Sequence, residues 1–136
     1  SAGASGMSDT MIVGGEAGTA KKNTLTMAPG LGLIRSVVVD QHFAQRGRIG
    51  RLLSAVSQNP YVLGVGIDED TAILVQSNGK FSVIGSNTVT VIDASTSTTT
   101  NVSEINQGQA LVLSPVLMHV LSEGYSFDLK QRVSLL

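Results

Sequence analysis

The residues best suited to chemistry form one polar segment, DQHFAQRGRIGR at positions 40–51, which follows an apolar run. His42, one of only two histidines, stands where a buried strand is expected to end. Because imidazole gains and loses a proton near neutral pH, a histidine in this place is a natural general base. The alternative is a structural histidine whose ring is satisfied by a backbone carbonyl. His119 lies inside an apolar run, LMHVL, and fits that structural role better.

Three carboxylates follow the next apolar run, in the sequence GIDED at positions 66–70. Like charges this close together cost energy unless a cation or an imidazole balances them. One of the three could therefore orient His42 and stabilise its protonated ring, as the acid of a catalytic triad does. The alternatives are a solvated acidic turn, a helix start, or a magnesium or calcium site, although no EF-hand pattern of oxygen ligands supports a metal.

The chain opens on a serine followed by small residues, Ser1-Ala2-Gly3. In a nucleophile elbow, G-x-S-x-G, a strand turns sharply into a helix and presents the serine oxygen, and helix N–H groups help to form an oxyanion hole. Only the second half of that pattern is present, and by itself it also fits a helix start with a serine N-cap. Together with His42 and the carboxylates, Ser1 indicates a serine hydrolase whose nucleophile opens the chain.

Three arginines, Arg46, Arg48 and Arg51, follow His42 closely. Arg48 and Arg51 are one helical turn apart and would share a face. A guanidinium binds a carboxylate through two parallel hydrogen bonds, so the cluster predicts capture of a substrate carboxylate beside His42. The alternative is a solvated or salt-bridged helix start.

The composition bounds the class of protein. The chain has 136 residues, 42% of them hydrophobic and 14% charged, which fits one domain with a core and excludes a disordered tail. The net charge of −1 gives no reason to expect nucleic acid or a membrane as partner. The absence of cysteine excludes disulfides, thiolate zinc sites and a cysteine nucleophile. No apolar run reaches the ~18 residues of a membrane span and no signal peptide is apparent, so we expect a cytoplasmic protein.

Apolar periodicity predicts the elements that must position these residues. Three apolar residues share a helical face and predict a short helix over 2–13. The β-branched residues 37–39 are apolar on both faces, which is typical of a central parallel strand. Apolar positions recur at helical spacing over 48–57, and residues 61–67 form another buried strand candidate.

The second part of the chain has an antiparallel pattern. Two apolar runs, 71–76 and 81–84, flank Asn78-Gly79, which predicts a hairpin with a type I′ turn. Residues 87–92 alternate threonine with valine, as a half-buried strand does. The remaining elements are a polar loop over 95–100, an edge strand or two short strands over 110–121 where Pro115 interrupts the run, and a strand or short helix over 125–136.

These elements are too few for a complete doubly wound sheet, which needs several βα units. The chain supplies about two such units and an antiparallel meander, and its first helix has no strand before it. We therefore expect residues 1–136 to be the C-terminal half of a single α/β domain. The missing N-terminal half would come from a separate chain or a removed segment.

The segments SAGAS at 1–5, DQHFAQRGRIGRLL at 40–53 and GIDEDTA at 66–72 resemble the cyanophycinase family of serine peptidases, which is related to dipeptidase E. The resemblance covers nearly the whole chain. It implies a three-layer flavodoxin-like α/β fold related to the class I glutamine amidotransferase fold. It also implies hydrolysis of β-aspartyl linkages: cyanophycin is a poly-aspartate backbone with arginine on each β-carboxylate, and the family releases β-Asp-Arg dipeptides.

The resemblance carries roles over to individual residues. Ser1 matches the family's nucleophile, His42 its general base and Glu69 its acid partner. Further matches line the family's substrate cleft, at Asp40, Gln41, Arg46, Arg48 and Arg51. The resemblance implies no metal and no organic cofactor, and it makes a dimer of the complete unit a reasonable expectation.

The chain departs from the family pattern at its start, because the glycine-rich strand end that precedes the serine is absent. Cleavage directly before Ser1 would free an α-amine with an ordinary pKa of about 8, which could compete with His42 as the base. Two rival hypotheses follow from this. One is a self-processed family member that acts on a different isopeptide or amide, and the other is a non-catalytic subunit that keeps the fold for binding.

Overall fold

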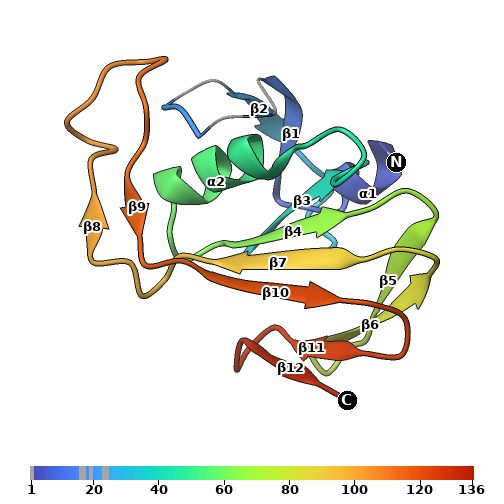
Figure 1. Ribbon diagram of the computed structural model, residues 1–136. Helices are drawn as coiled ribbons and strands as arrows, with labels where there is room; N and C mark the ends of the chain where they lie inside the picture. Colours follow the sequence, from blue (N-terminus) through green and yellow to red (C-terminus); the bar gives the residue numbers. More distant parts are fainter. Residues whose placement is uncertain (1, 16–17, 19, 23–24) are drawn as a thin grey trace.

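The computed structural model describes residues 2–15, 18, 20–22 and 25–136. Its centre is a mixed sheet, shown in Figure 1, in which β3 and β4 run parallel while β7 and β10 are antiparallel to their neighbours. The order of strands across this sheet is β10 (Leu117–Leu121), β7 (Val89–Asp93), β4 (Leu63–Ile67), β3 (Val37–Gln41).

One face of the central sheet is covered by α2 (Ile49–Gln58) and by a ribbon of β1 (Thr10–Gly15) and β2 (Leu25–Pro29). The helix forms because its apolar residues recur at helical spacing, and Leu52 is fully buried against the sheet. Gly64 of β4 permits this approach, since a Cβ there would lie 2.9 Å from Cγ of Leu52. The helix that carries Arg51, with Arg48 at its N-cap, is thereby fixed directly above the parallel strands.

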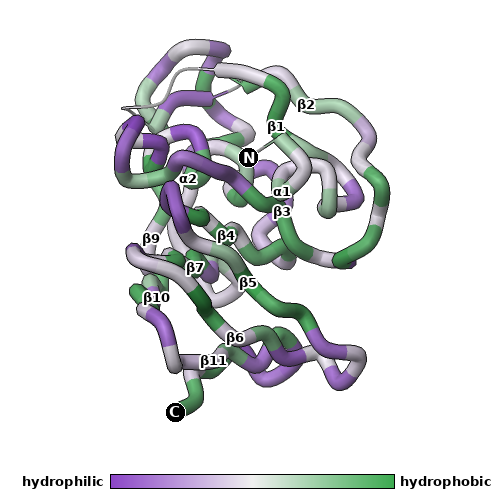
Figure 2. The backbone as a smooth tube through the Cα atoms, turned by 90° about the vertical axis from the view of Figure 1, so that its right-hand side faces the viewer, coloured by the Kyte–Doolittle hydropathy of each residue, from purple (hydrophilic) through white to green (hydrophobic). Residues whose placement is uncertain are grey.

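The opposite face packs against α1 (Ala2–Gly6) and a second sheet. Phe81 and Phe127 are fully buried there, with ring centroids 5.7 Å apart. Figure 2 shows apolar residues along β5 and β6 on this side of the molecule. The order of strands across the second sheet is β12 (Val133–Leu135), β11 (Ser126–Asp128), β6 (Lys80–Gly85), β5 (Thr71–Val75). The described chain is thus an α/β structure of mixed sheets, made mostly of strands.

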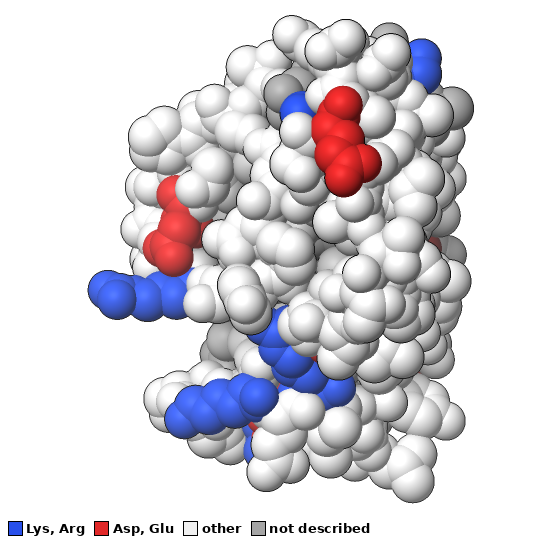
Figure 3. All heavy atoms as spheres, turned by 90° about the vertical axis from the view of Figure 1, so that its left-hand side faces the viewer, with Lys and Arg blue, Asp and Glu red and all other residues white. Residues whose placement is uncertain are grey.

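A long arm containing β8 (Thr99–Thr100) and β9 (Leu113–Ser114) lies at the left in Figure 1, beside α2. It is tied to the segment before β2, because Lys22 Nζ donates to the carbonyl of Ile105 at 2.8 Å. Figure 3 shows this side of the molecule as mostly uncharged surface with a few separate groups of basic and acidic side chains. The arm therefore offers no concentrated charge for a charged partner.

Most of the predicted elements are present. The parallel strand over 37–39, the helix over 48–57 and the strand over 61–67 are confirmed as β3, α2 and β4. The hairpin is confirmed as β5 and β6, and the run interrupted by Pro115 forms two strands, β9 and β10. Residues 125–136 form strands β11 and β12 rather than a helix.

Four details of the prediction were wrong. The polar loop predicted over 95–100 ends in the short strand β8, which pairs with β9. The helix over 2–13 ends at Gly6, and residues 10–15 form β1, because their backbone pairs with β2, which the sequence analysis missed. The hairpin turn is not type I′: Gly79 has a φ of 81° but Asn78 does not have a positive φ, as expected for a type I turn followed by a left-handed glycine. The strand over 87–92 is buried on both faces because sheet and helix cover it.

Candidate active site

The two polar segments singled out in the sequence meet at one edge of the central sheet. β3 and β4 are parallel, and their last residues, Gln41 and Ile67, are paired in register. The residues that follow the two strands therefore leave the sheet side by side, at the carboxyl ends where ligands bind in α/β proteins. His42 and the acidic turn 68–70 are brought together in this way.

The His42 ring is hydrogen-bonded to the carboxylate of Glu69, with 2.9 Å between Nδ1 and Oε1. A carboxylate only accepts, so Nδ1 carries the proton and the neutral ring keeps a lone pair on Nε2. The two side chains are 26% and 48% exposed, and an ion pair this accessible adds little to stability. The arrangement suits a general base oriented by a carboxylate better than it suits a structural bridge.

The backbone at His42 makes a sharp turn out of β3. His42 has a φ of 47°, in the left-handed region that non-glycine residues seldom adopt. The next residue, Phe43, donates its N–H to the carbonyl of Ile67 at 3.2 Å and is 5% exposed. Its ring packs on Gly66, where a Cβ would lie 2.3 Å from Cγ of Phe43. The absence of a side chain at Gly66 thus lets Phe43, and with it the histidine turn, pack directly on β4.

The backbone of Glu69 is held from two sides by amide side chains. Its N–H donates to Oε1 of Gln45 at 3.0 Å, and its carbonyl accepts from Nδ2 of Asn87 at 2.9 Å. The hydroxyl of Thr71 donates to the same carbonyl at 3.0 Å. Sequence analysis missed all three residues. Gln45 lies in the conspicuous motif, but no local signal connects Asn87 with a residue 18 positions earlier.

The two aspartates that flank Glu69 have other partners. Asp68 accepts hydrogen bonds from Ala44 and Thr88, and Asp70 accepts one from the hydroxyl of Ser86. Of the three carboxylates in this turn, the one that contacts the His42 ring belongs to Glu69. Its catalytic role stays a prediction.

Asp40 and Arg51 form a buried pair beneath the site. Asp40 is fully buried and Arg51 is 5% exposed. Arg51 Nε donates to Oδ2 of Asp40 at 2.6 Å, and Nη2 bonds the other carboxylate oxygen. Capture of a substrate carboxylate by Arg51 would require it to leave Asp40. The geometry therefore favours a structural role for this pair over the substrate contacts that we expected.

Arg48 and Arg46 differ in what they can reach. Arg48 Nη1 donates to the carbonyl of Gln41 at 2.7 Å. Burial and the neighbouring Arg51 guanidinium lower the pKa of Arg48 below its ordinary value, against the opposing effect of Asp40. Arg46 is exposed, so of the three arginines it has the most freedom to meet a ligand. Substrate binding by these residues stays a prediction.

A cavity of about 480 Å³ opens beside His42 and Glu69. Its volume is that of a typical small-ligand site. It is lined by α1, by the end of β3 and by the acidic turn, at Ala4, Gln41, His42, Ile67, Asp68, Glu69, Asp70 and Thr71. Oε1 of Gln41 is buried without a hydrogen-bond partner in the described part of the chain. Ser1 lies outside the described residues, but Ala4, three positions later, lines this cavity.

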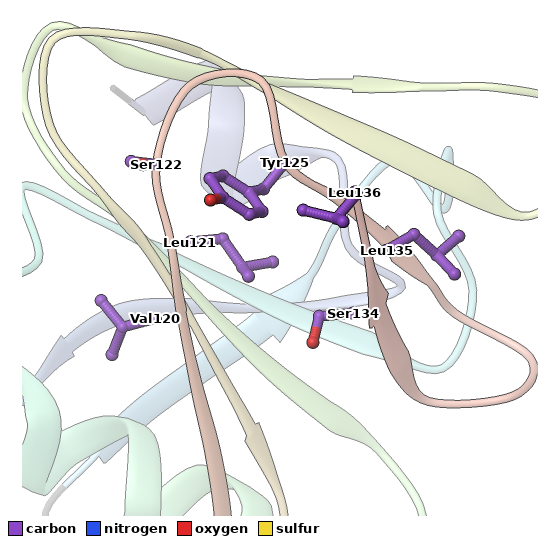
Figure 4. Close-up of a pocket in the computed structure, with 7 residues that line it drawn as sticks. All are labelled: Val120, Leu121, Ser122, Tyr125, Ser134, Leu135 and Leu136. Carbon is purple, nitrogen blue, oxygen red and sulfur yellow. The ribbon is translucent and has the colours of Figure 1, made fainter.

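A second cavity of about 400 Å³, shown in Figure 4, lies near the end of the chain. The side chains of Leu121, Tyr125 and Leu136 surround it, and its lining contains neither a charged group nor a histidine. His119 is nearby in β10, where its ring meets the edge of Phe127 at 5.0 Å between centroids. Nothing in this lining could transfer a proton at neutral pH, so it is a weaker candidate for catalysis.

The described residues contain neither a metal-binding cluster nor a helix suited to span a membrane. No group of three or more histidine or acidic side chains in residues 2–15, 18, 20–22 and 25–136 is arranged to hold a metal ion. Within the same ranges, no helix combines the length and the apolar character needed to cross a membrane.

Comparison with known proteins gives a consistent result. Residues 1–84 match Peptidase family S51. Over 136 residues the chain is 44% identical to a protein of Trichormus variabilis named cyanophycinase, which covers 99% of this chain and 46% of that protein. Cyanophycinases of Geminocystis herdmanii and Synechococcus elongatus are 43% and 38% identical over 131 residues, which is 96% of this chain and 48% and 41% of theirs. The chain thus spans about half the length of the curated relatives it matches.

Proposed function

This chain belongs to peptidase family S51, and from that premise we propose that it forms the catalytic part of a serine peptidase that cleaves β-aspartyl linkages, as in cyanophycin. The observation that carries the proposal is the cavity shared by α1, His42 and Glu69. The oriented imidazole of His42 lines the same cavity as Ala4 of α1, the helix that follows Ser1 in the sequence.

In the proposed mechanism Ser1 is the nucleophile and His42 is its base. Glu69 accepts a hydrogen bond from the Nδ1–H of His42 and so keeps Nε2 unprotonated, and Nε2 takes the hydroxyl proton as the serine oxygen attacks the carbonyl. The carboxylate stabilises the imidazolium that results, and the ring then returns the proton to the leaving amine. Hydrolysis of the acyl-enzyme by water repeats these transfers in the second half of the cycle. Every step uses groups of the chain, and none requires a metal or an organic cofactor.

The substrate class follows from the names of the relatives and from the charges of the pocket. The relatives are named for cyanophycin, whose β-linked arginine offers a guanidinium and a free carboxylate. Carboxylates of the acidic turn line the cavity and could meet the guanidinium, and the exposed Arg46, four positions after His42, is the candidate partner of the free carboxylate. Gln41, whose Oε1 has no partner among the described residues, would accept a hydrogen bond from the substrate. The expected product is the β-Asp-Arg dipeptide, released by an exopeptidase.

The finer expectations about architecture are part of the same proposal. We infer a flavodoxin-like domain, related to the class I glutamine amidotransferase fold, in which this chain is the C-terminal half. The other half would complete the sheet and supply oxyanion donors. A dimer of the complete unit, a cytoplasmic location and cleavage before Ser1 stay predictions.

The test is turnover of β-Asp-Arg substrates by the natural full-length protein and its variants. His42→Ala and Glu69→Gln should lower kcat by about 100-fold or more, because the base or its orienting charge is lost. His119→Ala removes the other histidine and should leave kcat unchanged, since that ring lies against Phe127. Near wild-type turnover in His42→Ala would remove the residue from the mechanism, whereas absence of turnover in the unaltered protein would favour a non-catalytic binding subunit.

A further inference from the structure

The carboxylate of Asp68 connects the histidine turn to the rest of the fold. Asp68 is 6% exposed, and both of its oxygens accept hydrogen bonds. Oδ1 accepts from the Ala44 N–H at 3.0 Å. Oδ2 accepts from the Thr88 N–H at 3.1 Å and from the Thr88 hydroxyl at 2.9 Å. One side chain thus joins the residue two positions after His42, the end of β4 and the entry to β7.

The histidine turn needs such a connection because its backbone is strained. A left-handed φ costs a non-glycine residue roughly 1–2 kcal/mol and persists only where the surroundings fix it. Some of the turn's hydrogen bonds are internal, such as that from the Arg46 N–H to the His42 carbonyl at 3.1 Å. The bonds that reach outward from its backbone run from Phe43 to Ile67 and from Ala44 to Asp68. The second of these depends on a side chain.

We propose that Asp68 is a positioning residue, which holds His42 within hydrogen-bond distance of Glu69 by fixing the turn that carries the ring; as a catalytic effect this rests on the proposed function. A carboxylate is required because both oxygens must accept. An asparagine amide would present its NH₂ group either to the Ala44 N–H or to the Thr88 N–H. Because Thr88 supplies two donors and Ala44 only one, the amide oxygen would turn to Thr88 and the histidine turn would be released.

The first experiment compares Asp68→Asn with Asp128→Asn in the natural full-length protein. Asp128 is a matched control, since it is also buried and its Oδ1 accepts the backbone N–H groups of Lys130 and Gln131, both at 2.9 Å. Asp68→Asn should lower kcat for β-Asp-Arg release by about 10- to 100-fold with a much smaller change in KM, because a base displaced by about 1 Å loses rate of that order. Asp128→Asn should destabilise the fold and leave kcat unchanged.

A second readout does not depend on turnover. In protein labelled with ¹⁵N-histidine, the Nδ1 proton held between His42 and Glu69 gives a low-field NMR signal, and His119 serves as an internal reference. Asp68→Asn should abolish or shift the His42 signal, whereas Asp128→Asn should keep it. If the unaltered protein releases no β-Asp-Arg, the proposed function fails while this signal still decides whether Asp68 positions the ring.

A milder pair of variants covers the case in which Asp68→Asn does not fold. Thr88→Val removes one of the three donors to Asp68, and Thr88→Ser keeps it. Thr88→Val should lower kcat several-fold and shift the His42 signal, and Thr88→Ser should restore both. The proposal is overturned if Asp68→Asn, or Thr88→Val in its place, keeps wild-type kcat and an unshifted ring signal, or if Asp128→Asn loses kcat as severely.

Discussion

At the scale of single residues, the buried ion pair of Asp40 and Arg51 stabilises the fold next to the candidate active site. Two guanidiniums, those of Arg48 and Arg51, stand at the start of α2, where the helix dipole disfavours positive charge. Asp40 lies between them, bonded to Arg51 and 3.8 Å from Nη1 of Arg48. The negative charge of the Asp40 carboxylate offsets the repulsion between the two guanidiniums and the cost of burying them.

Asp40→Asn should therefore destabilise the fold strongly. Breaking a buried ion pair by neutralising one partner costs about 3–5 kcal/mol, because the other charge stays buried. Urea unfolding measures this cost, and the double variant Asp40→Asn/Arg51→Met should recover part of it by removing the orphaned cation. If the unfolding free energy of Asp40→Asn lies within about 0.5 kcal/mol of wild type, the pair is not structural. Arg51 would then again be a candidate for substrate binding.

The sequence predicted which residue types meet at the site but not how they divide the work. His42 and an acidic turn could be expected together because both follow buried strands that run in parallel. The residues alone did not single out one of the three carboxylates, and Glu69 was indicated only by the family resemblance. Asp68 is engaged by Thr88, 20 positions away, and such a pairing leaves no local trace. Likewise, the sequence did not show that Asp40 and Arg51 bind each other instead of each contacting a substrate.

At the scale of elements, the glycine in the middle of GVGID controls how closely the histidine turn approaches β4. Phe43 is the first residue after His42, and its ring occupies the space that a side chain at Gly66 would need. The position of the ring and that of the imidazole next to it are therefore coupled.

Gly66→Ala should displace Phe43 and with it His42. The new Cβ would lie 2.3 Å from Cγ of Phe43, so the ring must move, at a cost of about 1–3 kcal/mol in unfolding free energy and a clear loss of kcat. Gly14→Ala is the matched control, because a Cβ there meets nothing within 4 Å. Thermal unfolding and turnover measure the two effects. If the two variants have the same unfolding temperature and the same kcat, the packing of Phe43 on Gly66 does not position His42.

Elements with a clear period were predictable, and those defined by a distant partner were not. α2 follows from apolar positions at helical spacing, and β3 from three successive valines. β1 was taken for the end of a helix, because its residues become a strand only through pairing with β2. The turn at Gly79 was predicted in place but not in type, since Asn78 is compatible with either backbone conformation.

At the scale of the whole molecule, Asp93 joins segments far apart in the chain. Arg132 donates to Oδ1 of Asp93 at 2.8 Å and also to the carbonyl of Tyr61, and the Ser95 N–H donates to the same carboxylate oxygen at 2.9 Å. Burial of Asp93 opposes its charged form, but the hydrogen bonds from Ser95 and the charge of Arg132 outweigh it and lower the pKa below its ordinary value.

The fold should consequently lose stability in acid, partly through Asp93. A carboxyl whose pKa is lower in the folded state contributes stability above its ordinary pKa of about 4 and loses that contribution as the pH falls through the folded value. The free energy of unfolding of the wild type, measured with urea, should fall from about pH 6 to about pH 3. For Asp93→Asn it should fall less over the same interval. The same pH dependence in both proteins would contradict the assignment.

The arrangement of the whole sheet was the least accessible to prediction. Residues 87–92 were expected to be half-buried, yet β7 is covered on both faces, because α2 packs on one face of the central sheet and the second sheet packs on the other. Likewise, the second sheet arises from pairing of β11 with β6 across more than 40 positions. Only the three-dimensional packing decides such neighbours.

The central claim, that Ser1, His42 and Glu69 act together on one cavity, is tested most directly by covalent labelling of the serine. A fluorophosphonate probe reacts with a serine oxygen that a neighbouring base activates. Intact mass and peptide mapping of the natural full-length protein should show one adduct at Ser1, formed much more slowly in His42→Ala and Glu69→Gln but at the wild-type rate in His119→Ala. Absence of an adduct at Ser1, or a labelling rate indifferent to His42, would contradict the account.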